Sequence, residues 1–459
     1  MLPLLFILVA IYVSLYFLGL PIGWASTTFY IINSILFLVI SVWYLLKYKR
    51  NNIICFELLF GISYWLCCFF AVFVIEEMNH GIVSMQMLNF SEQMMCRACS
   101  LSMLGYLLYM LGLCCRRQQI VNNKDFVINQ NPMVNKLLNY ATTFFIILFF
   151  LLGGYNFIYS YDQTMTFDVL GGERFGRFGV AMENAILLLN VTTISNIFVI
   201  NESEYHNGWK FIRKIDKHYM FNLLVMSMFL LICGYRSGAM QIFIPFFVAL
   251  SLKRVIKYKG AILILAIGIA LLALIGLFRS KTASVSEINE GMSLALFFRD
   301  FLGANSATPS LMEYVDMYGS AHFRNAINQI LAAIPYMQSI MLGILGPGYG
   351  AMSSSKLYTD EISRSFYSGM GTNIVGDLYY TGGFACVVIL MFLLGCVVRK
   401  LSNSTNKYAL IAFSCLVGNA VFMPRVEFFF IWRACFHSMI LYLIVNIILS
   451  YRKGRVYKI

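Results

Sequence analysis

Long apolar segments alternate with short polar segments along almost the whole chain. A helix needs about 20 apolar residues to cross the ~30 Å hydrocarbon core of a bilayer, and twelve segments reach or approach that length. The seventh and eighth are short enough to form a hairpin that is tilted or embedded among the others. The pattern therefore predicts an all-α, polytopic membrane protein with about twelve transmembrane helices. The predicted spans are residues 2–20, 29–46, 53–75, 94–115, 138–159, 179–200, 221–234, 238–252, 261–278, 380–398, 408–422 and 428–450.

One long polar region interrupts this alternation after the ninth predicted span. It divides the chain into three predicted parts: residues 1–278 with spans one to nine, residues 279–379 as one large outer loop, and residues 380–459 with the last three spans and a tail. The loop lacks a periodic pattern sufficient for a core of its own, but it contains apolar stretches at 292–302 and 326–345. A further span there would place the two termini on opposite sides of the membrane. We therefore expect helices that lie in the outer membrane interface.

The composition limits the classes of protein that the chain can belong to. Hydrophobic residues make up 60% of the chain and charged residues 12%, whereas soluble globular domains have about 45–50% and about 25%. A soluble globular protein, a disordered chain and a secreted disulfide scaffold are all excluded by these values. The twelve cysteines lie in or beside apolar segments without the spacing of a zinc site. We expect them to be small packing residues in the membrane.

The net charge of +13 indicates membrane orientation. If the N-terminus is cytoplasmic, the predicted inner segments contain 22 Lys and Arg, and the short outer segments contain five. Cytoplasmic loops are enriched in these residues, so the distribution predicts that both termini face the cytoplasm. The cations are too few and too scattered for a nucleic-acid-binding surface, and no nucleic acid is expected as a partner.

The cations of the predicted outer side are mostly arginine. Nine Arg and two Lys lie there, whereas the inner side has eight Arg and fourteen Lys. Either residue can orient a span, but only guanidinium presents a rigid fork that fits two phosphate oxygens at once. The outer arginines therefore indicate an anion-binding site, and pairing with outer carboxylates is the alternative. The chain has no phosphate-binding loop, nucleophile elbow or HExxH motif, and its five His are dispersed, so we expect no metal and no cofactor.

Several arginines lie where a predicted span begins or ends. They are Arg236 between the seventh and eighth spans, Arg279 at the end of the ninth, Arg425 before the last span, and Arg433 inside it. A charge inside a span is costly unless it faces a water-filled cavity or a partner. For Arg433, Glu183 and Glu427 are the alternative partners.

Two other stretches contain candidate binding or catalytic residues. Residues 173–179 carry Arg174 and Arg177 between aromatic residues, which suits either sugar stacking or the ordinary aromatic belt of a membrane interface. Asp377 stands at the start of the tenth span. A carboxylate there can act as a base, orient a sugar hydroxyl, or cap a helix.

Three segments resemble a known family. Cys233-Gly234-Tyr235-Arg236-Ser237-Gly238 resembles the G-x-R turn of bacterial oligosaccharide repeat-unit polymerases. Residues 376–383, Gly-Asp-Leu-Tyr-Tyr-Thr-Gly-Gly, resemble their G-E-x-Y-x-x-x-G segment, with Asp377 in place of the commoner Glu. The interrupted apolar stretch that ends at residues 333–335 is also similar. The chain thus resembles the Wzy-type polymerases of O-antigen or capsule; the plan of spans covers the whole chain and the motifs only a small part of it.

The resemblance implies a metal-independent, GT-C-like membrane glycosyltransferase at the outer face of the bacterial inner membrane. Such an enzyme transfers a growing glycan from undecaprenyl pyrophosphate to a sugar hydroxyl of the incoming lipid-linked unit. Arginines placed in advance would stabilise the charge that develops on the leaving pyrophosphate. Further candidate partners are a chain-length regulator and a flippase. The residues expected to act are Arg236, Arg279, Arg364 and Arg425 at the pyrophosphate, Asp377 and Glu427 at the acceptor hydroxyl, and Arg174, Arg177, Arg299, Tyr379 and Arg433 in substrate binding.

Two other functions compete with polymerisation. A flippase for the same lipid-linked sugars would need charges along its spans to line a central cavity, and few spans here carry any. An O-antigen ligase usually has a His in its large loop that is followed about ten residues later by Gly. Here the residue at that distance from His322 is Ala332. We therefore expect a polymerase, with the flippase and the ligase as alternatives.

Overall fold

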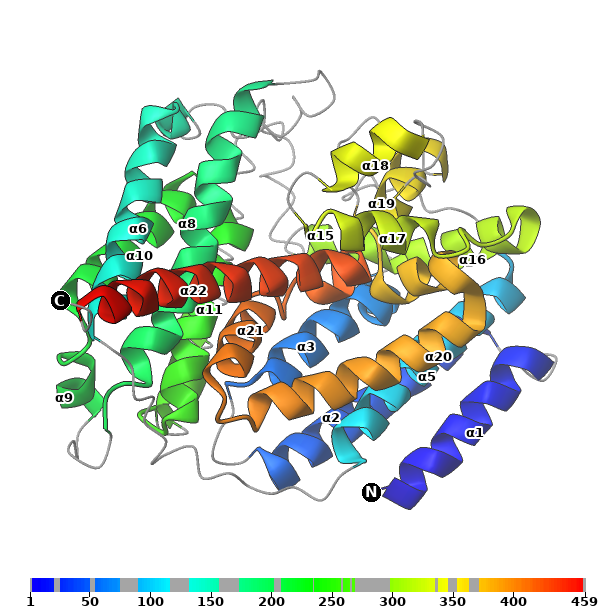
Figure 1. The fold of residues 1–459 in the computed structure, drawn as a ribbon. Helices are drawn as coiled ribbons and strands as arrows, with labels where there is room; N and C mark the ends of the chain where they lie inside the picture. The colour runs from blue at the N-terminus through cyan, green and yellow to red at the C-terminus, as the bar shows by residue number, and fades with distance from the viewer. Residues whose placement is uncertain are drawn as a thin grey trace, which may run out of the picture.

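The structure is a computed structural model that describes fourteen segments of the chain. They are residues 2–19, 25–49, 54–74, 90–115, 132–156, 173–201, 208–233, 235–256, 259–264, 266–268, 298–334, 337–345, 353–362 and 371–456. Every regular element in these segments is a helix (Figure 1).

The first half of the chain forms α1 (Leu2–Leu18), α2 (Ser26–Tyr48), α3 (Phe56–Cys68), η1 (Phe70–Val74), α5 (Glu92–Cys114), α6 (Pro132–Leu151), η3 (Gly154–Asn156), α8 (Glu173–Ile197), α9 (Gly208–Ile212), α10 (Lys217–Ile232) and α11 (Arg236–Leu252). Residues 259–264 and 266–268 are also helical. The second half forms α15 (Arg299–Asn305), α16 (Ala307–Tyr318), α17 (Arg324–Leu331), α18 (Met337–Leu345), α19 (Ser354–Lys356), η8 (Leu357–Ile362), α20 (Ile374–Ser402), α21 (Lys407–Gly418), η9 (Met423–Arg425) and α22 (Phe428–Val456).

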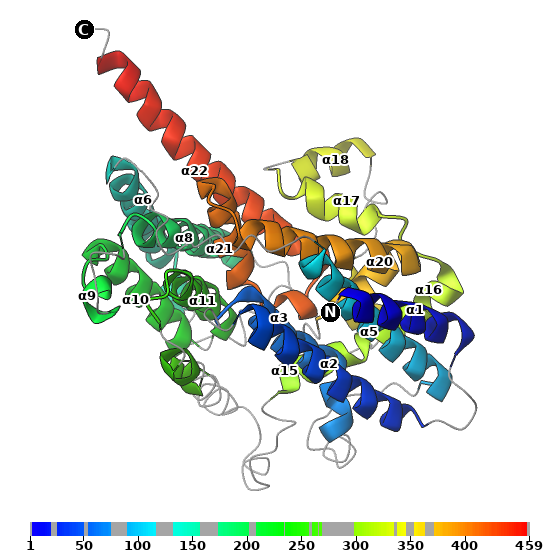
Figure 2. The same cartoon turned by 90° about the horizontal axis from the view of Figure 1, so that it is seen from below.

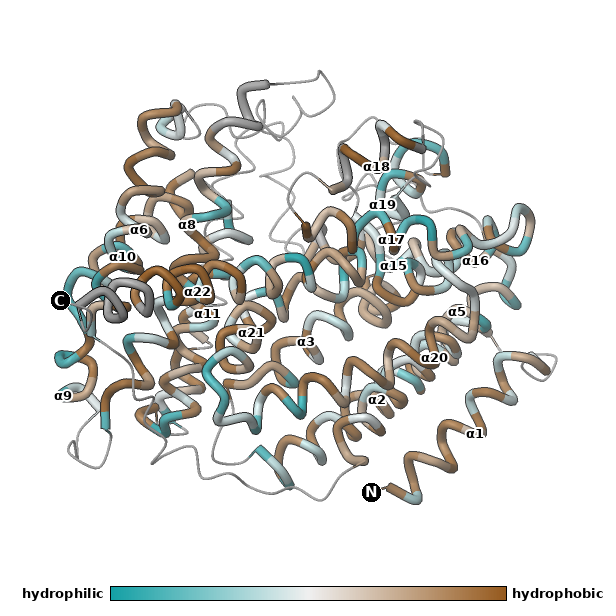
Figure 3. Tube along the Cα trace, viewed as in Figure 1, coloured by the Kyte–Doolittle hydropathy of each residue, from teal (hydrophilic) through white to brown (hydrophobic). Residues whose placement is uncertain are grey.

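The predicted all-α, polytopic membrane architecture is confirmed. Among the described residues, six helices are long and apolar enough to cross a membrane: α2, α5, α6, α20, and the parts Phe178–Ile197 of α8 and Phe428–Leu449 of α22. Six shorter apolar helices accompany them: α1, α3, α10, α11, residues 259–268 and α21. Each predicted span overlaps one of these helices, although most of the ninth lies outside the described residues. In Figure 3 the long helices are apolar over most of their length, and polar residues gather near their ends.

The helices form two packed groups that share α21 and α22. One core lies among α1, α2, α3, α5 and α20 and contains Phe60, Tyr64 and Met391. The other lies among α6, α8, α10 and α11 and contains Phe149 and Tyr219. Residues of α21 and α22 belong to both cores. Figures 1 and 2 show the first group in blue and orange and the second in green, with α21 and α22 between them.

The helices α5 and α20 approach each other closely, and two glycines make this contact possible. A Cβ atom added at Gly112 would overlap the Phe392 carbonyl oxygen, and one added at Gly395 would overlap the Tyr109 carbonyl oxygen. Small residues that let two backbones approach are typical of helix pairs in membranes, where dispersion contacts replace the hydrophobic effect between helices. This contact fixes α20, which carries several of the predicted site residues.

The predicted outer loop contributes a layer of short helices. In this layer α15 packs against α3, α16 against α20 and α5, and α17 against α22. The apolar stretch 326–345 is divided into α17 and α18, as its interruption suggested. The apolar pattern did not predict α16, because Thr308 and Ser310 interrupt its buried first half and its second half is largely exposed.

The start of α20 differs from the predicted span. The helix begins at Ile374, six residues before the predicted start of the tenth span, because the side chain of Asn373 accepts a hydrogen bond from the backbone N–H of Val375 (2.8 Å) and caps the helix. The predicted boundary between the loop and the last spans therefore falls inside a helix. Asp377 and Tyr379 are helical residues as a result.

Cations predicted to lie on the inner side bind the ends of helices. The Lys253 ammonium donates to the Ile200 carbonyl oxygen, just after α8 (3.3 Å), and the Arg399 guanidinium donates to the Leu113 carbonyl oxygen at the end of α5 (2.8 Å). Carbonyl groups in the last turn of a helix have no partner within the helix and carry partial negative charge, so a nearby cation stabilises them. These inner cations thus also hold neighbouring helices together.

The α5–α20 contact makes a testable prediction. Gly395→Ala should lower the midpoint of thermal unfolding in detergent, since the added methyl group must push two backbones apart at a cost of about 1–3 kcal/mol. Gly61→Ala is the matched control, because a Cβ atom at this buried helical glycine meets nothing within 4 Å. Equal midpoints for the two variants would show that the contact is looser than described.

Candidate functional site at the start of α20

The first two turns of α20 lie at the centre of the predicted site. Residues Ile374 to Thr381 are all buried. Gly376 packs closely against α16, where an added Cβ atom would lie 3.2 Å from the Ala307 carbonyl oxygen. The side chains that follow on this segment point to different neighbouring helices. Each predicted residue here thus contacts a different part of the molecule.

Asp377 is completely buried, and both of its carboxylate oxygens accept hydrogen bonds. The Ser354 hydroxyl on α19 donates to Oδ1 (2.6 Å), and the backbone N–H of Phe428 at the start of α22 donates to Oδ2 (2.9 Å). A helix N-terminus has unpaired N–H groups and partial positive charge, so it stabilises a carboxylate. Asp377 therefore caps α22, whereas the sequence suggested a cap for the helix on which Asp377 itself stands, α20. The same carboxylate joins α22 to α19 and α20.

Glu427 lies beside Asp377 and is the residue immediately before α22. The backbone N–H of Ser355 lies 3.4 Å from its Oε1, and the amide of Gln329 on α17 donates to Oε2. Partial burial raises the pKa of Glu427 above its ordinary value, although hydrogen bonds from Ser353 to Ser355 oppose the shift. We call Asp377, Glu427, Ser354, Ser355 and Gln329 the carboxylate cluster. In this cluster Asp377 is enclosed, whereas Glu427 is only half-buried.

Two of the predicted arginines lie on the same stretch of chain as Glu427. The guanidinium of Arg425, on η9, stacks over the ring of Phe301 with 5.8 Å between its central carbon and the ring centroid. Arg433, on α22, lies 3.7 Å from the Glu183 carboxylate on α8, and both side chains are partly exposed. The pairing with Glu183 that the sequence left open is therefore present. Arg425 and Arg433 flank the start of the last span.

The remaining predicted arginines are described only partly: for some of them the structure describes the backbone alone, and others lie outside the described residues. Arg236 is the first residue of α11. The side chains of Arg174, Arg177 and Arg299 lie outside the described residues, although their backbones belong to α8 and α15. Arg279 and Arg364 lie outside the described residues altogether. The described part of the structure thus brings together Asp377 and Glu427 from the predicted set, and Arg425 precedes Glu427 by two residues in the chain.

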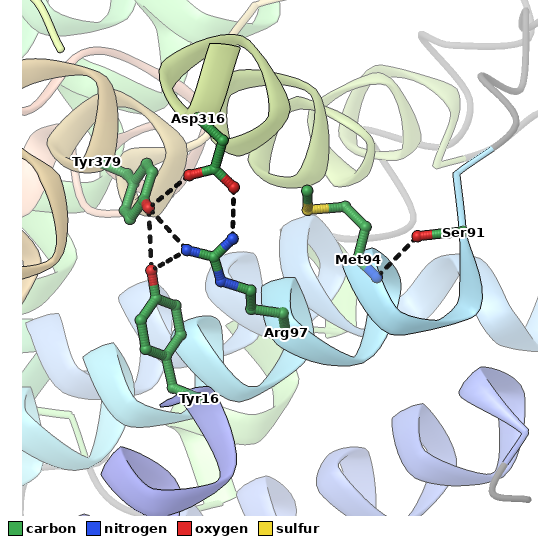
Figure 4. A network of polar contacts seen from close by, with 6 residues as sticks. All are labelled: Tyr16, Ser91, Met94, Arg97, Asp316 and Tyr379. Carbon is green, nitrogen blue, oxygen red and sulfur yellow. Dashed lines mark hydrogen bonds and ion pairs between the residues drawn. The ribbon is translucent and has the colours of Figure 1, made fainter. Parts of the chain in front are cut away.

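Tyr379 belongs to a second polar cluster, which Figure 4 shows and which the sequence did not predict as a site. Arg97 on α5 donates to the Tyr16 hydroxyl on α1 (2.8 Å), to the Tyr379 hydroxyl (3.1 Å) and to the carboxylate of Asp316 on α16. The Tyr379 hydroxyl also donates to Asp316 (3.2 Å). This arginine network joins four helices, and Arg97 and Tyr16 border a cavity of about 240 Å³.

The arginine network has only a weak signal in the sequence. Arg97 is a cation near the start of an otherwise apolar helix, and such a residue is expected to have a partner. Asp316 lies far from it along the chain, on a helix that the apolar pattern did not predict. No local pattern could therefore have identified the pair.

A break in α20 follows these two clusters. Gly382 and Gly383 have non-helical backbone angles, and Gly383 has a φ of 70°, a region that favours glycine. The backbone N–H of Ala321 donates to the Tyr380 carbonyl oxygen (2.7 Å), and that of Phe323 donates to the Thr381 carbonyl oxygen (2.9 Å). The turn before α17 thus supplies the hydrogen bonds that the broken helix lacks.

The chain matches the family described as O-antigen polysaccharide polymerase Wzy over residues 2–455. The chain belongs to this family. The match covers the spans, the outer layer and the carboxylate cluster, and it confirms the resemblance seen in the sequence. Searches of the curated proteins and of the solved structures gave no match.

Membership of the Wzy family establishes the reaction. The protein is a polysaccharide-polymerising glycosyltransferase that acts on lipid-linked repeat units. Among the described residues of this Wzy polymerase, no three His, Cys, Asp or Glu side chains are grouped as metal ligands would be. The carboxylate cluster and the arginine network are two groups of polar side chains that adjoin its layer of short helices.

The position of Asp377 in the Wzy polymerase makes a testable prediction. Asp377→Ala should lower the midpoint of thermal unfolding in detergent, because it leaves the buried Phe428 N–H without an acceptor at a cost of about 1–3 kcal/mol. Asp377→Asn should lower it less, since its side-chain oxygen can still accept from that N–H. Asp360→Ala is the control, because Asp360 is exposed. A midpoint for Asp377→Ala equal to that of the control would contradict the capping role.

Proposed function

We propose that the enzyme joins its repeat units at the outer face of the bacterial inner membrane, with undecaprenyl pyrophosphate as the lipid carrier. In this proposal all twelve apolar helices cross the membrane, in a GT-C-like arrangement, and both termini face the cytoplasm. The excess of Lys and Arg in the inner segments supports this orientation.

The observation that carries the catalytic proposal is the environment of Glu427. Its carboxylate is half-buried, its pKa is raised, and it lies two residues from Arg425. The amide oxygen of Gln329 next to it is buried and has no hydrogen-bond donor among the described residues. A buried acceptor of this kind usually has a partner, and a sugar hydroxyl can supply the donor. The cluster therefore suits an acceptor hydroxyl.

In the proposed reaction the acceptor hydroxyl attacks the anomeric carbon of the growing glycan. The bond between that carbon and the pyrophosphate oxygen breaks, and the pyrophosphate leaves with the electron pair. Glu427 accepts the hydroxyl proton, and its raised pKa makes it a better base than an ordinary carboxylate. Asp377 is a positioning residue in this scheme, because both of its oxygens accept hydrogen bonds within the protein and it fixes the N-terminus of α22, which follows Glu427 directly.

The arginines serve the leaving group in this proposal. Charge grows on the pyrophosphate as the bond breaks, and guanidinium groups held in a partly dry site stabilise that charge. Arg425 is the nearest candidate to Glu427 along the chain, and Arg236, Arg279 and Arg364 complete the set. Arg433, Arg174, Arg177 and Arg299 bind the lipid-linked substrates, and Tyr379 helps to position Arg97. A chain-length regulator and a flippase remain candidate partners.

Replacement of the proposed base tests this scheme. Glu427→Gln should abolish chain growth while the protein stays in the membrane, because the amide cannot accept the proton. The surface glycan of a deletion strain that carries the variant should then show a single repeat unit on a gel. Asp360→Asn, an exposed carboxylate in the same layer, should give the normal length distribution. Long chains from Glu427→Gln would exclude this residue as the base.

The same base predicts a pH dependence in the purified enzyme. Because a base must be deprotonated, the rate of chain growth in proteoliposomes should fall as the pH is lowered through the raised pKa of Glu427. Growth that stays constant down to the ordinary titration range of glutamate would argue for another base.

The arginine set makes a separate prediction. Arg236→Ala and Arg279→Ala should each leave the protein in the membrane and abolish chain growth. Replacement by Lys should restore little growth if the two-pronged geometry of guanidinium is required. Normal glycan lengths in both alanine variants would refute this role.

A further inference from the structure

The helix α17 has its polar side chains turned toward the protein and its apolar side chains turned outward. Asn325 is only 2% exposed, and its amide donates to the Thr381 hydroxyl (2.8 Å). Gln329 donates to Glu427. In contrast, Ile327 is 39% exposed and Ile330 is 51% exposed. A helix on a water-exposed surface shows the opposite arrangement.

Two polar contacts place α17 along the outer part of a candidate membrane span. Gln329 contacts Glu427 just before α22, and the ring of His437 hydrogen-bonds the Ala333 carbonyl oxygen two residues after α17 (2.7 Å). His437 lies nine residues beyond Phe428, which is about 14 Å along a helix with a rise of 1.5 Å per residue. The end of α17 therefore lies beside a part of α22 that is well inside the span.

The contact between His437 and Ala333 also solves a problem that a helix end meets in lipid. The last carbonyl groups of a helix have no partner within it, and an unpaired carbonyl in hydrocarbon costs several kcal/mol. His437 provides a donor for the Ala333 carbonyl oxygen, in the turn that follows α17. Irregular backbone at membrane depth requires internal partners of this kind.

The next helix continues the apolar surface. In α18 Ile340 is 52% exposed and Ile344 is 71% exposed, and Ile334 between the two helices is 42% exposed. α18 packs against α17, and Figure 2 shows the two helices together beside the start of α22. Arg324, at the start of α17, is exposed. The two helices thus begin with an exposed charge, and the residues that follow expose isoleucine side chains.

We propose that α17 and α18 form a re-entrant hairpin in the outer leaflet of the membrane, with these isoleucines in contact with lipid hydrocarbon. The chain enters and leaves the leaflet on the same side, so the hairpin leaves the orientation of the other spans unchanged. It lies deeper than the interfacial position expected from the sequence. Through Gln329 it also forms the lipid-facing wall of the carboxylate cluster, a role that rests on the proposed function of Glu427.

Cysteine accessibility tests the position of the hairpin. Ile330→Cys and Ile344→Cys would be compared with Glu313→Cys, an exposed acidic position on α16, and with Val39→Cys, a position on α2 that is 58% exposed on a long candidate span. The native chain is a suitable background, because nine of its twelve cysteines are buried and the other three are Cys114, Cys115 and Cys396 at predicted inner helix ends. Spheroplasts would be treated with a membrane-impermeant maleimide.

The proposal expects rapid labelling of Glu313→Cys alone. Ile330→Cys and Ile344→Cys should remain unlabelled, like Val39→Cys, until sodium dodecyl sulfate is added. Labelling of either isoleucine variant at the rate of Glu313→Cys would overturn the proposal and place the hairpin in water.

A second measurement separates lipid from a covering protein. The purified variants in lipid nanodiscs contain no partner, and modification at each position can be read by peptide mass spectrometry. If residues 330 and 344 stay protected from the maleimide in nanodiscs, the result supports contact with lipid. If they become labelled in nanodiscs, the surface is covered by a protein partner in the cell, and the proposal is overturned. Neither readout depends on glycan length, so both would stand if Glu427 were not the base.

Discussion

The buried carboxylate of Asp377 is the contact on which the junction of α19, α20 and α22 depends. A carboxylate with no exposure to water must receive hydrogen bonds, because desolvation of a charge without them is very costly. Its two donors, Ser354 and the N-terminus of α22, come from segments far apart in the sequence. The constraint therefore fixes where α19 and α22 meet α20. It also fixes Glu427, which immediately precedes α22.

The break in α20 extends this arrangement to the rest of the outer layer. A continuous helix would satisfy its own carbonyl groups and offer no binding surface to the turn before α17. The Gly382–Gly383 break leaves two carbonyl groups for that turn, and the turn adopts positive φ values at His322 and Phe323 to reach them. Such angles are unfavourable for these residues. The hydrogen bonds and the packing of Phe323 against Gly382 compensate for that cost.

These connections give the proposed site two contrasting sides. Asp377 and the arginine network lie among packed helices, where fixed polar groups need little rearrangement during a reaction. On the other side, α17 contributes Gln329 to the carboxylate cluster and presents isoleucine outward. A long lipid substrate needs such a boundary, since its pyrophosphate and sugars require polar groups while its hydrocarbon remains in the bilayer. Under the proposed arrangement, α17 joins the polar part of the site to its lipid-facing part.

The amino-acid sequence by itself determined the membrane architecture, since the length and order of apolar segments are local properties and each predicted span coincides at least partly with a helix. It also identified residues 376–383 as a special segment and Arg433 as a charge in need of a partner. Only the tertiary structure decided that Asp377 caps α22, that Arg97 pairs with Asp316, and that α16 packs on α20. These contacts join residues that are distant in the chain, and α16 is amphipathic rather than apolar. Their physical cause is the need to pair buried polar groups across helices, and a single sequence does not show which pairs meet.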